Sequence, residues 1–232
     1  MNPEELRRWA ECKERIASCH ECLNHWSPRI EAPIGTKEVP NPKPPISILF
    51  VGVAPPPHGK DEDEDVGHFY SNPCDRLRVG LFHVIDRTYK TNLTKQNRDS
   101  REAGTTAFLD AGFFFLHAAK VRPCRGHSAP TVRIIRFCAR LHLVEEICLL
   151  KPHGVCFLGT SYAAPAAEAI FGFPLGDDPK EVEIACADQK EGWRGLAVAT
   201  VQPVRGTKEG RNRERTSKVI EGLRSGLANW KQ

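Results

Sequence analysis

Four short apolar runs, separated by segments with helical periodicity, constrain the fold of this 232-residue chain most strongly. The runs cover residues 46–53, 112–119, 154–159 and 196–201. Apolar runs of this length without polar alternation are typical of strands that are buried on both faces. Helical patterns occupy residues 1–20, 77–89, 131–150, 161–170 and 213–230. This alternation predicts an α/β fold with a largely parallel sheet covered by helices on both faces.

The clearest helical pattern spans residues 131–150. Its predicted apolar stripe passes through Ile135, Cys138, Leu141 and Val144, so these side chains are expected to face the core.

A sheet of this kind binds ligands beyond the carboxyl ends of its strands. The loops of interest therefore begin at Gly52, Lys120, Gly159 and Gln202. The first loop combines glycine and proline with the acidic residues 61–65 and an aromatic pair. An aromatic ring can stack on a flat substrate and a carboxylate can orient a water molecule. A solvated acidic turn beside core aromatics is the alternative interpretation.

The charge distribution points weakly to nucleic acid. The formal net charge is only +4, but residues 201–232 hold eight Lys and Arg against three Glu. A basic segment can neutralise phosphates, although a solvated helix face explains the same pattern. The chain contains no run of about 18 apolar residues and no apolar signal core at its start, so we expect a soluble, cytoplasmic protein without membrane contact.

The chain has nine cysteines, an odd number that does not favour a disulfide scaffold and leaves buried thiols or metal ligands. Cys19 and Cys22 form a CxxC pair, and Cys124 and Cys138 are a second candidate pair. Four such thiols allow a four-iron, four-sulfur cluster or zinc, with four unrelated thiols as the alternative. The remaining cysteines, including Cys148 and Cys156, are assigned to the core.

Taken in order, these segments resemble the uracil-DNA glycosylase superfamily, particularly its iron–sulfur branch known as family four. The resemblance spans roughly residues 19–230, and the APPPHG segment at 54–59 is more similar to family five. The matching segments are CHEC at 19–22, FVGVAP at 50–55, EDVGHFY at 64–70, KVRPC at 120–124, Cys138, LG at 158–159 and QP at 202–203.

The resemblance implies a three-layer α/β/α fold with a short, mostly parallel sheet. It implies one domain over residues 1–232, with the N-terminal helix and CxxC segment (1–45) packed on it. It also implies a four-iron cluster, with zinc as the alternative, and a pocket for a base flipped out of DNA. The implied metal ligands are Cys19, Cys22, Cys124 and Cys138. The implied base site comprises Gly52, Val53, Ala54, His58 and an aromatic ring, Tyr70 or Phe69. The implied DNA contacts are Arg205, Lys208, Arg211 and Arg213.

Two departures from the family pattern affect the expected chemistry. Val53 stands where family four has an acidic residue, so Asp65 or Asp75 is expected to orient the water. Gln202 replaces a histidine that stabilises charge on the base, and it can donate only a neutral hydrogen bond. In addition, Cys124 lies three positions later than the family's cysteine.

The leading hypothesis is a monomeric, monofunctional DNA-repair glycosylase that hydrolyses the N-glycosidic bond of uracil or another deaminated base. The second hypothesis is a catalytically altered or inactive homologue that binds nucleic acid around a structural iron–sulfur cluster. The third is a zinc-bound α/β protein that acts on a small nucleotide-like substrate.

Overall fold

The central sheet has five strands in the order β3-β2-β5-β7-β6. The computed structural model describes residues 2–22, 30–33, 39–56, 69–123, 130–186, 192–204 and 209–230. The strands are β2 (Ile48–Gly52), β3 (Phe113–His117), β5 (Gly154–Leu158), β6 (Lys180–Ile184) and β7 (Trp193–Thr200). The first four in spatial order are parallel and β6 is antiparallel at the edge. The predicted largely parallel sheet is confirmed.

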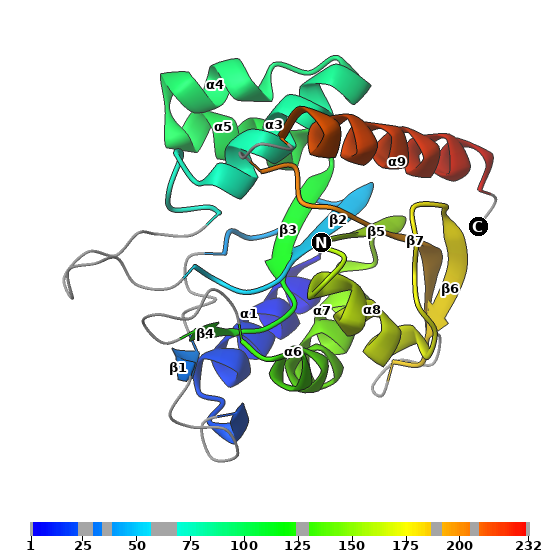
Figure 1. Cartoon of the computed structure of the whole chain (residues 1–232). Coiled ribbons are helices and arrows are strands. Elements are labelled where there is room, and N and C mark those ends of the chain that lie inside the picture. Colours follow the sequence, from blue (N-terminus) through cyan, green and yellow to red (C-terminus); the bar gives the residue numbers. More distant parts are fainter. Residues whose placement is uncertain are drawn as a thin grey trace.

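Helices cover both faces of this sheet, which gives three layers (Figure 1). One layer holds α3 (Arg76–Tyr89), α4 (Leu93–Asp99), α5 (Arg101–Asp110) and α9 (Glu209–Asn229). The other holds α1 (Pro3–Ala17), α6 (Val132–Cys138), α7 (Val144–Leu150) and α8 (Ala163–Phe171). The α/β/α class is therefore confirmed. Within the described ranges, no helix is both long and apolar enough to cross a membrane.

The helix predicted over residues 131–150 contains a π-helical turn, η2 (Ala139–Leu143), between α6 and α7. A π turn places one more residue in the turn than an α turn does, so the helix face changes after Cys138. Leu141 is 43% exposed, whereas His142 and Leu143 are buried. The prediction that Leu141 faces the core was therefore wrong.

Five of the described elements were not predicted from the sequence: α4, α5, β6 and the strands β1 (Ile30–Pro33) and β4 (Val121–Pro123), which form a two-stranded antiparallel sheet. β6 has the sequence KEVEI, in which Val182 and Ile184 are buried and the charged residues are exposed. Charged residues of this kind are common on edge strands, where they discourage pairing with another chain. The segment therefore lacks the continuous apolar run of the central strands.

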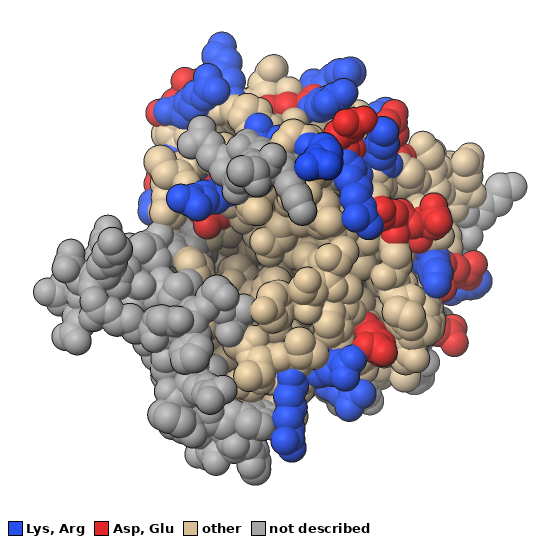
Figure 2. All heavy atoms as spheres, in the orientation of Figure 1, with Lys and Arg blue, Asp and Glu red and all other residues tan. Residues whose placement is uncertain are grey.

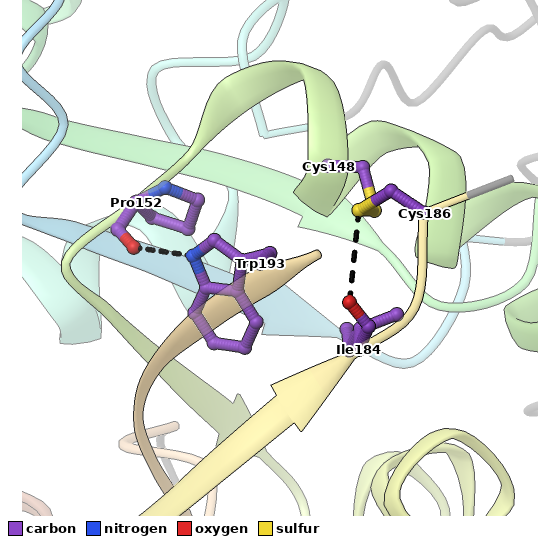
Figure 3. Close-up of a disulfide and its surroundings, with 5 residues drawn as sticks. All are labelled: Cys148, Pro152, Ile184, Cys186 and Trp193. Atoms are coloured by element: carbon purple, nitrogen blue, oxygen red, sulfur yellow. Dashed lines mark hydrogen bonds between the residues drawn. A yellow bond between two sulfur atoms is a disulfide. The ribbon is translucent and has the colours of Figure 1, made fainter. Parts of the chain in front are cut away.

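A disulfide joins Cys148, near the end of α7, to Cys186, just after β6, with 6.0 Å between their Cα atoms (Figure 3). Nearby, the indole nitrogen of Trp193 donates a hydrogen bond of 2.7 Å to the Pro152 carbonyl. Cys148 lies in the core, as predicted, but the sequence did not favour a disulfide, and here the fold brings a partner from 38 positions away. Cys156 is a fully buried free thiol in β5, as predicted.

Candidate functional site

The carboxyl ends of the parallel strands bring the predicted loops to one edge of the sheet. β2 ends at Gly52, which is paired in register with His117, the last residue of β3. β5 ends at Leu158, which pairs with Thr200 at the end of β7. Gln202 follows two positions later. Chain segments that are far apart in the sequence thus meet where an open α/β sheet binds ligands.

Two glycines allow the chain to approach closely at this edge. A Cβ atom added to Gly52 would lie 2.6 Å from the Phe115 ring and 3.4 Å from Nδ1 of His117. Gly159 has a φ of +126°, which side chains rarely adopt. A Cβ atom there would lie 3.4 Å from Val53 Cγ2 and 3.5 Å from Gln202 Nε2. The side chains of Val53 and Gln202 therefore converge over Gly159.

The half-buried Gln202 amide is held in place from two sides. Its Nε2 atom donates a 3.3 Å hydrogen bond to the Leu158 carbonyl. The next residue, Pro203, packs against α3, because a Cβ atom on Gly80 would lie 1.8 Å from the Pro203 carbonyl oxygen. This contact fixes the start of the loop that links β7 to α9. The Gln202 side chain thus has a defined position at the sheet edge.

Phe69 and Tyr70, the predicted stacking residues, both lie in the core. The Phe69 ring stacks on Phe115, with centroids 4.0 Å apart and an interplanar angle of 12°. The Tyr70 hydroxyl donates to the Phe115 carbonyl at 3.2 Å and accepts from the Phe115 N–H at 2.8 Å. Tyr70 thereby satisfies the open edge of β3. A base could stack on either ring only if these contacts opened.

Arg78, in the first turn of α3, holds this aromatic segment. Its side chain is fully buried, and burial lowers its pKa to about 10. The guanidinium donates hydrogen bonds to the Phe69 carbonyl at 2.9 Å and to Asn97 Oδ1 at 2.7 Å. It also reaches Thr105 Oγ1 and the Arg101 carbonyl, and lies 5.0 Å from the Phe82 ring centroid. Carbonyls and rings, with no carboxylate in hydrogen-bond contact among the described residues, therefore accommodate the buried cation.

Among the predicted water-orienting residues, Asp75 has a capping role. Its Oδ1 atom accepts a 2.8 Å hydrogen bond from the Arg78 N–H and caps α3. This contact uses part of the carboxylate for helix capping. Asp65 and His58 lie outside the described residues, as do Arg205, Lys208 and Cys124.

Sequence reasoning missed His117. Its imidazole lies at the end of β3 beside Gly52, in edge-to-face contact with Phe115 at 4.9 Å between centroids. Both ring nitrogens are shielded from solvent. Its place at the end of a buried strand was the available signal, because the neighbouring strand ends were already candidate positions.

The structure brings two of the predicted metal ligands into contact. The Cys22 and Cys138 sulfur atoms are 3.1 Å apart, and both residues are buried. A hydrogen bond from Cys22 holds the pKa of the Cys138 thiol below its usual range, and the Lys120 N–H and ammonium add to this effect. The same contact, together with burial, raises the pKa of Cys22. Cys19 is half-buried. Burial is the main cause that raises the pKa of its thiol, and the negative charge at Cys138 raises it further.

No group of three or more His, Cys, Asp or Glu side chains arranged to hold a metal ion occurs within the described ranges. The charges of Cys19, Cys22 and Cys138 influence one another's pKa values. A complete metal site would still need a further ligand.

Lys120 connects the cysteines to the sheet edge. Its ammonium lies 2.5 Å from a Glu146 carboxylate oxygen and donates a 2.6 Å hydrogen bond to the His117 carbonyl. Its backbone N–H points to Cys138. Both Lys120 and Glu146 are almost fully buried. One residue therefore contacts both the candidate base site and the cysteine pair.

The two described basic residues of the predicted DNA loop face different surfaces. Arg213 lines a pocket with α3 and α4, whereas Arg211 lines another with Asp177 and Asp178. Residues two positions apart on a helix do not share a face, which accounts for the divergence.

Comparison with known proteins gives one positive result. The family model described as the Uracil DNA glycosylase superfamily matches residues 40–219. Comparison with curated proteins finds no match.

Proposed function

Because this chain belongs to the uracil DNA glycosylase superfamily, we propose that it hydrolyses the N-glycosidic bond of uracil or another deaminated base in DNA. The observation that best supports this proposal is the convergence of Gly52, His117, Gly159 and Gln202 at the carboxyl edge of the sheet. These residues combine close backbone approach with hydrogen-bonding side chains, which is what recognition of a flipped base requires.

In the proposed reaction, the bond between C1′ of the sugar and the base nitrogen breaks, and its electron pair remains on the base. Gln202 donates a hydrogen bond to the base oxygen on which charge develops, since its amide is already held at the sheet edge. His117 provides a second polar contact from β3. Water adds to C1′, its proton passes to a carboxylate, for which Asp65 is the candidate, and an abasic site remains.

A cleavage assay tests this activity directly. End-labelled oligonucleotides carrying one uracil, hypoxanthine or xanthine are incubated with the protein and then treated with alkali. Strand breakage at one lesion, absent from an undamaged control, is the expected result. Protein that binds the same oligonucleotides without cleaving any of them would contradict the proposal.

We also propose that Cys19, Cys22, Cys124 and Cys138 hold an iron–sulfur cluster. The contact between the Cys22 and Cys138 sulfur atoms supports this assignment, because it brings two of the four thiols close enough to bind one cluster. When bound, the cluster would serve as a structural link between the segment after α1 and the end of α6. Absorbance near ~400 nm in anaerobically purified protein, lost in Cys138→Ala, is the expected signature. Colourless protein that contains zinc would overturn it.

The binding-module alternative retains one supporting observation. Val53, an apolar residue, faces Gly159 at the position where a family-four enzyme has an acidic residue. Under this alternative the protein binds lesion-containing DNA and leaves it intact, so the cleavage assay separates the two functions.

A further inference from the structure

A pocket of about 510 Å³ lies between α3, α4 and the start of α9, outside the predicted base site. We call it the arginine pocket, because Arg76, Arg98 and Arg213 line it. His83, Cys74 and Thr94 also contribute to its wall, over an apolar floor that includes Phe82. Its volume is within the range of about 300–1,000 Å³ that is typical of ligand sites.

Within the described residues, no carboxylate balances the charges of Arg76 and Arg98 in this pocket. Among the described residues, neither Asp nor Glu lines it. The side chains of Arg76 and Arg98 make no ion pair or hydrogen bond with the rest of the described chain. Some arginines elsewhere are neutralised, as Arg136 is by Glu168. Figure 2 shows several Lys and Arg, with Asp and Glu among them, over the part of the molecule that holds α3, α4, α5 and α9.

The pocket beside the opposite face of α9 provides a comparison within the same protein. It is also lined by basic residues, but Arg215 pairs with Asp177 and Lys218 pairs with Glu214. Two of its three cations therefore have carboxylate partners, and Asp177, Asp178 and Glu214 line it as well. Of these two pockets, only the arginine pocket has no carboxylate among its described lining residues.

The local chemistry favours a phosphate group. Guanidinium groups bind phosphate through two parallel hydrogen bonds, and arginine loses little hydration in doing so. The Thr94 hydroxyl, which lines the pocket, has no hydrogen-bond partner among the described residues, so it can add a further contact to such a ligand.

The position of the pocket relates it to the substrate. Cys74 and Arg76 follow closely after the Phe69–Tyr70 segment, and Arg213 lies in the first turns of α9, after the loop that starts at Gln202. Both segments lead away from the candidate base site, and Pro203 packs directly on α3. We propose that the arginine pocket binds a backbone phosphate of the DNA strand that carries the target base. This inference rests on the proposed action on DNA.

The salt dependence of binding tests the proposal. The double variant Arg76→Gln/Arg98→Gln is compared with Arg87→Gln/Lys95→Gln, which removes the same charge from the same two helices outside the pocket. Binding of a labelled oligonucleotide is measured by fluorescence anisotropy over a range of salt concentrations. Losing one phosphate contact should reduce the slope of log K against log[salt] by about 0.9 in the pocket variant. In the control variant, the reduction of this slope should be smaller.

Equal slopes in the two variants, with wild-type protein that still binds and cleaves lesion DNA, would overturn the pocket assignment and leave the proposed function intact. Wild-type protein that binds no DNA would overturn both. We expect unchanged melting temperatures for both variants, because the four substituted side chains make no hydrogen bond or ion pair with other described residues.

Cys74 supplies a second, local measurement. Its exposed thiol lines the pocket, so an oligonucleotide should slow its alkylation, as followed by peptide mass spectrometry. The protection should disappear in Arg76→Gln/Arg98→Gln. Protection by a free deoxynucleoside monophosphate but not by the oligonucleotide would assign the pocket to a free nucleotide and refute the strand-phosphate proposal.

Discussion

At the scale of single residues, the Gln202 amide is the described group best placed to stabilise a leaving base. Gln202→Leu keeps the side-chain size and removes the hydrogen-bond donor. Loss of a donor that stabilises developing charge lowers kcat by on the order of 10²–10³. Single-turnover cleavage of a uracil oligonucleotide measures this effect.

Two results together would establish that role for Gln202. DNA affinity should change little in Gln202→Leu, because the contact strengthens mainly in the transition state. A variant with the wild-type cleavage rate would show that another group stabilises the leaving base.

Arg78 gives a prediction about stability rather than catalysis. Arg78→Met leaves the Asn97 side chain, the Phe69 carbonyl and the Thr105 hydroxyl without the donor that they now share. Each buried acceptor that is left without a donor costs about 1–3 kcal/mol. Urea unfolding should show this loss. The matched change Arg76→Met lies two positions earlier, at an exposed site without a side-chain partner among the described residues, and should stay within about 0.5 kcal/mol of wild type.

At the scale of elements, the π turn η2 determines which side chains of the long helix reach the core. The apolar stripe continues correctly through Cys138, because α6 is a regular helix. The extra residue of the π turn then moves Leu141 outward and His142 inward. Sequence periodicity assumes one constant helical repeat, so it predicts the helix but not this change of face.

The disulfide fastens the end of α7 to the end of β6. We expect Cys148→Ala/Cys186→Ala to lower the free energy of unfolding by about 2–4 kcal/mol, since the bridge restricts the unfolded chain. Thermal unfolding with and without a reductant measures the effect, and the variant should be insensitive to the reductant at this site. Peptide mapping that finds both thiols free in oxidised wild-type protein would contradict the assignment.

At the scale of the whole molecule, His142 links global stability to pH. Burial lowers its pKa from 6.5 to about 4, and the nearby charges of Lys120 and Arg15 add to this shift. The unfolded state therefore takes up a proton first as the pH falls. The stabilising contribution is complete above about pH 6.5 and is lost between 6.5 and 4, at about 1.4 kcal/mol per pH unit at most.

Denaturant unfolding at several pH values, compared with His142→Gln, isolates this contribution from other groups. Glu146 titrates in the opposite sense, because burial raises its pKa and acid then favours the folded state. The variant should lose less stability than wild type between pH 6.5 and 4. Parallel curves would show that His142 is not the responsible group.

Much of the fold and part of the site could be predicted from local patterns. The apolar runs located β2, β3, β5 and β7, and their ends located Gly52, Gly159 and Gln202 at one edge. The role of Tyr70 could not be read this way, because its hydroxyl bonds to the backbone of Phe115, 45 positions away. Short or charged elements such as α4 and β6 also lack a strong periodic signal.

The sequence by itself determined the alternation of buried strands and helices, and therefore the parallel sheet and the edge at which the candidate site lies. These features depend on residues that are close together in the chain. Only the tertiary structure decided the Cys148–Cys186 bridge, the contact between Cys22 and Cys138 and the grouping of Arg76, Arg98 and Arg213. Each of these arises because packed elements bring together residues that are far apart in the sequence. Such a contact leaves no local pattern in the sequence.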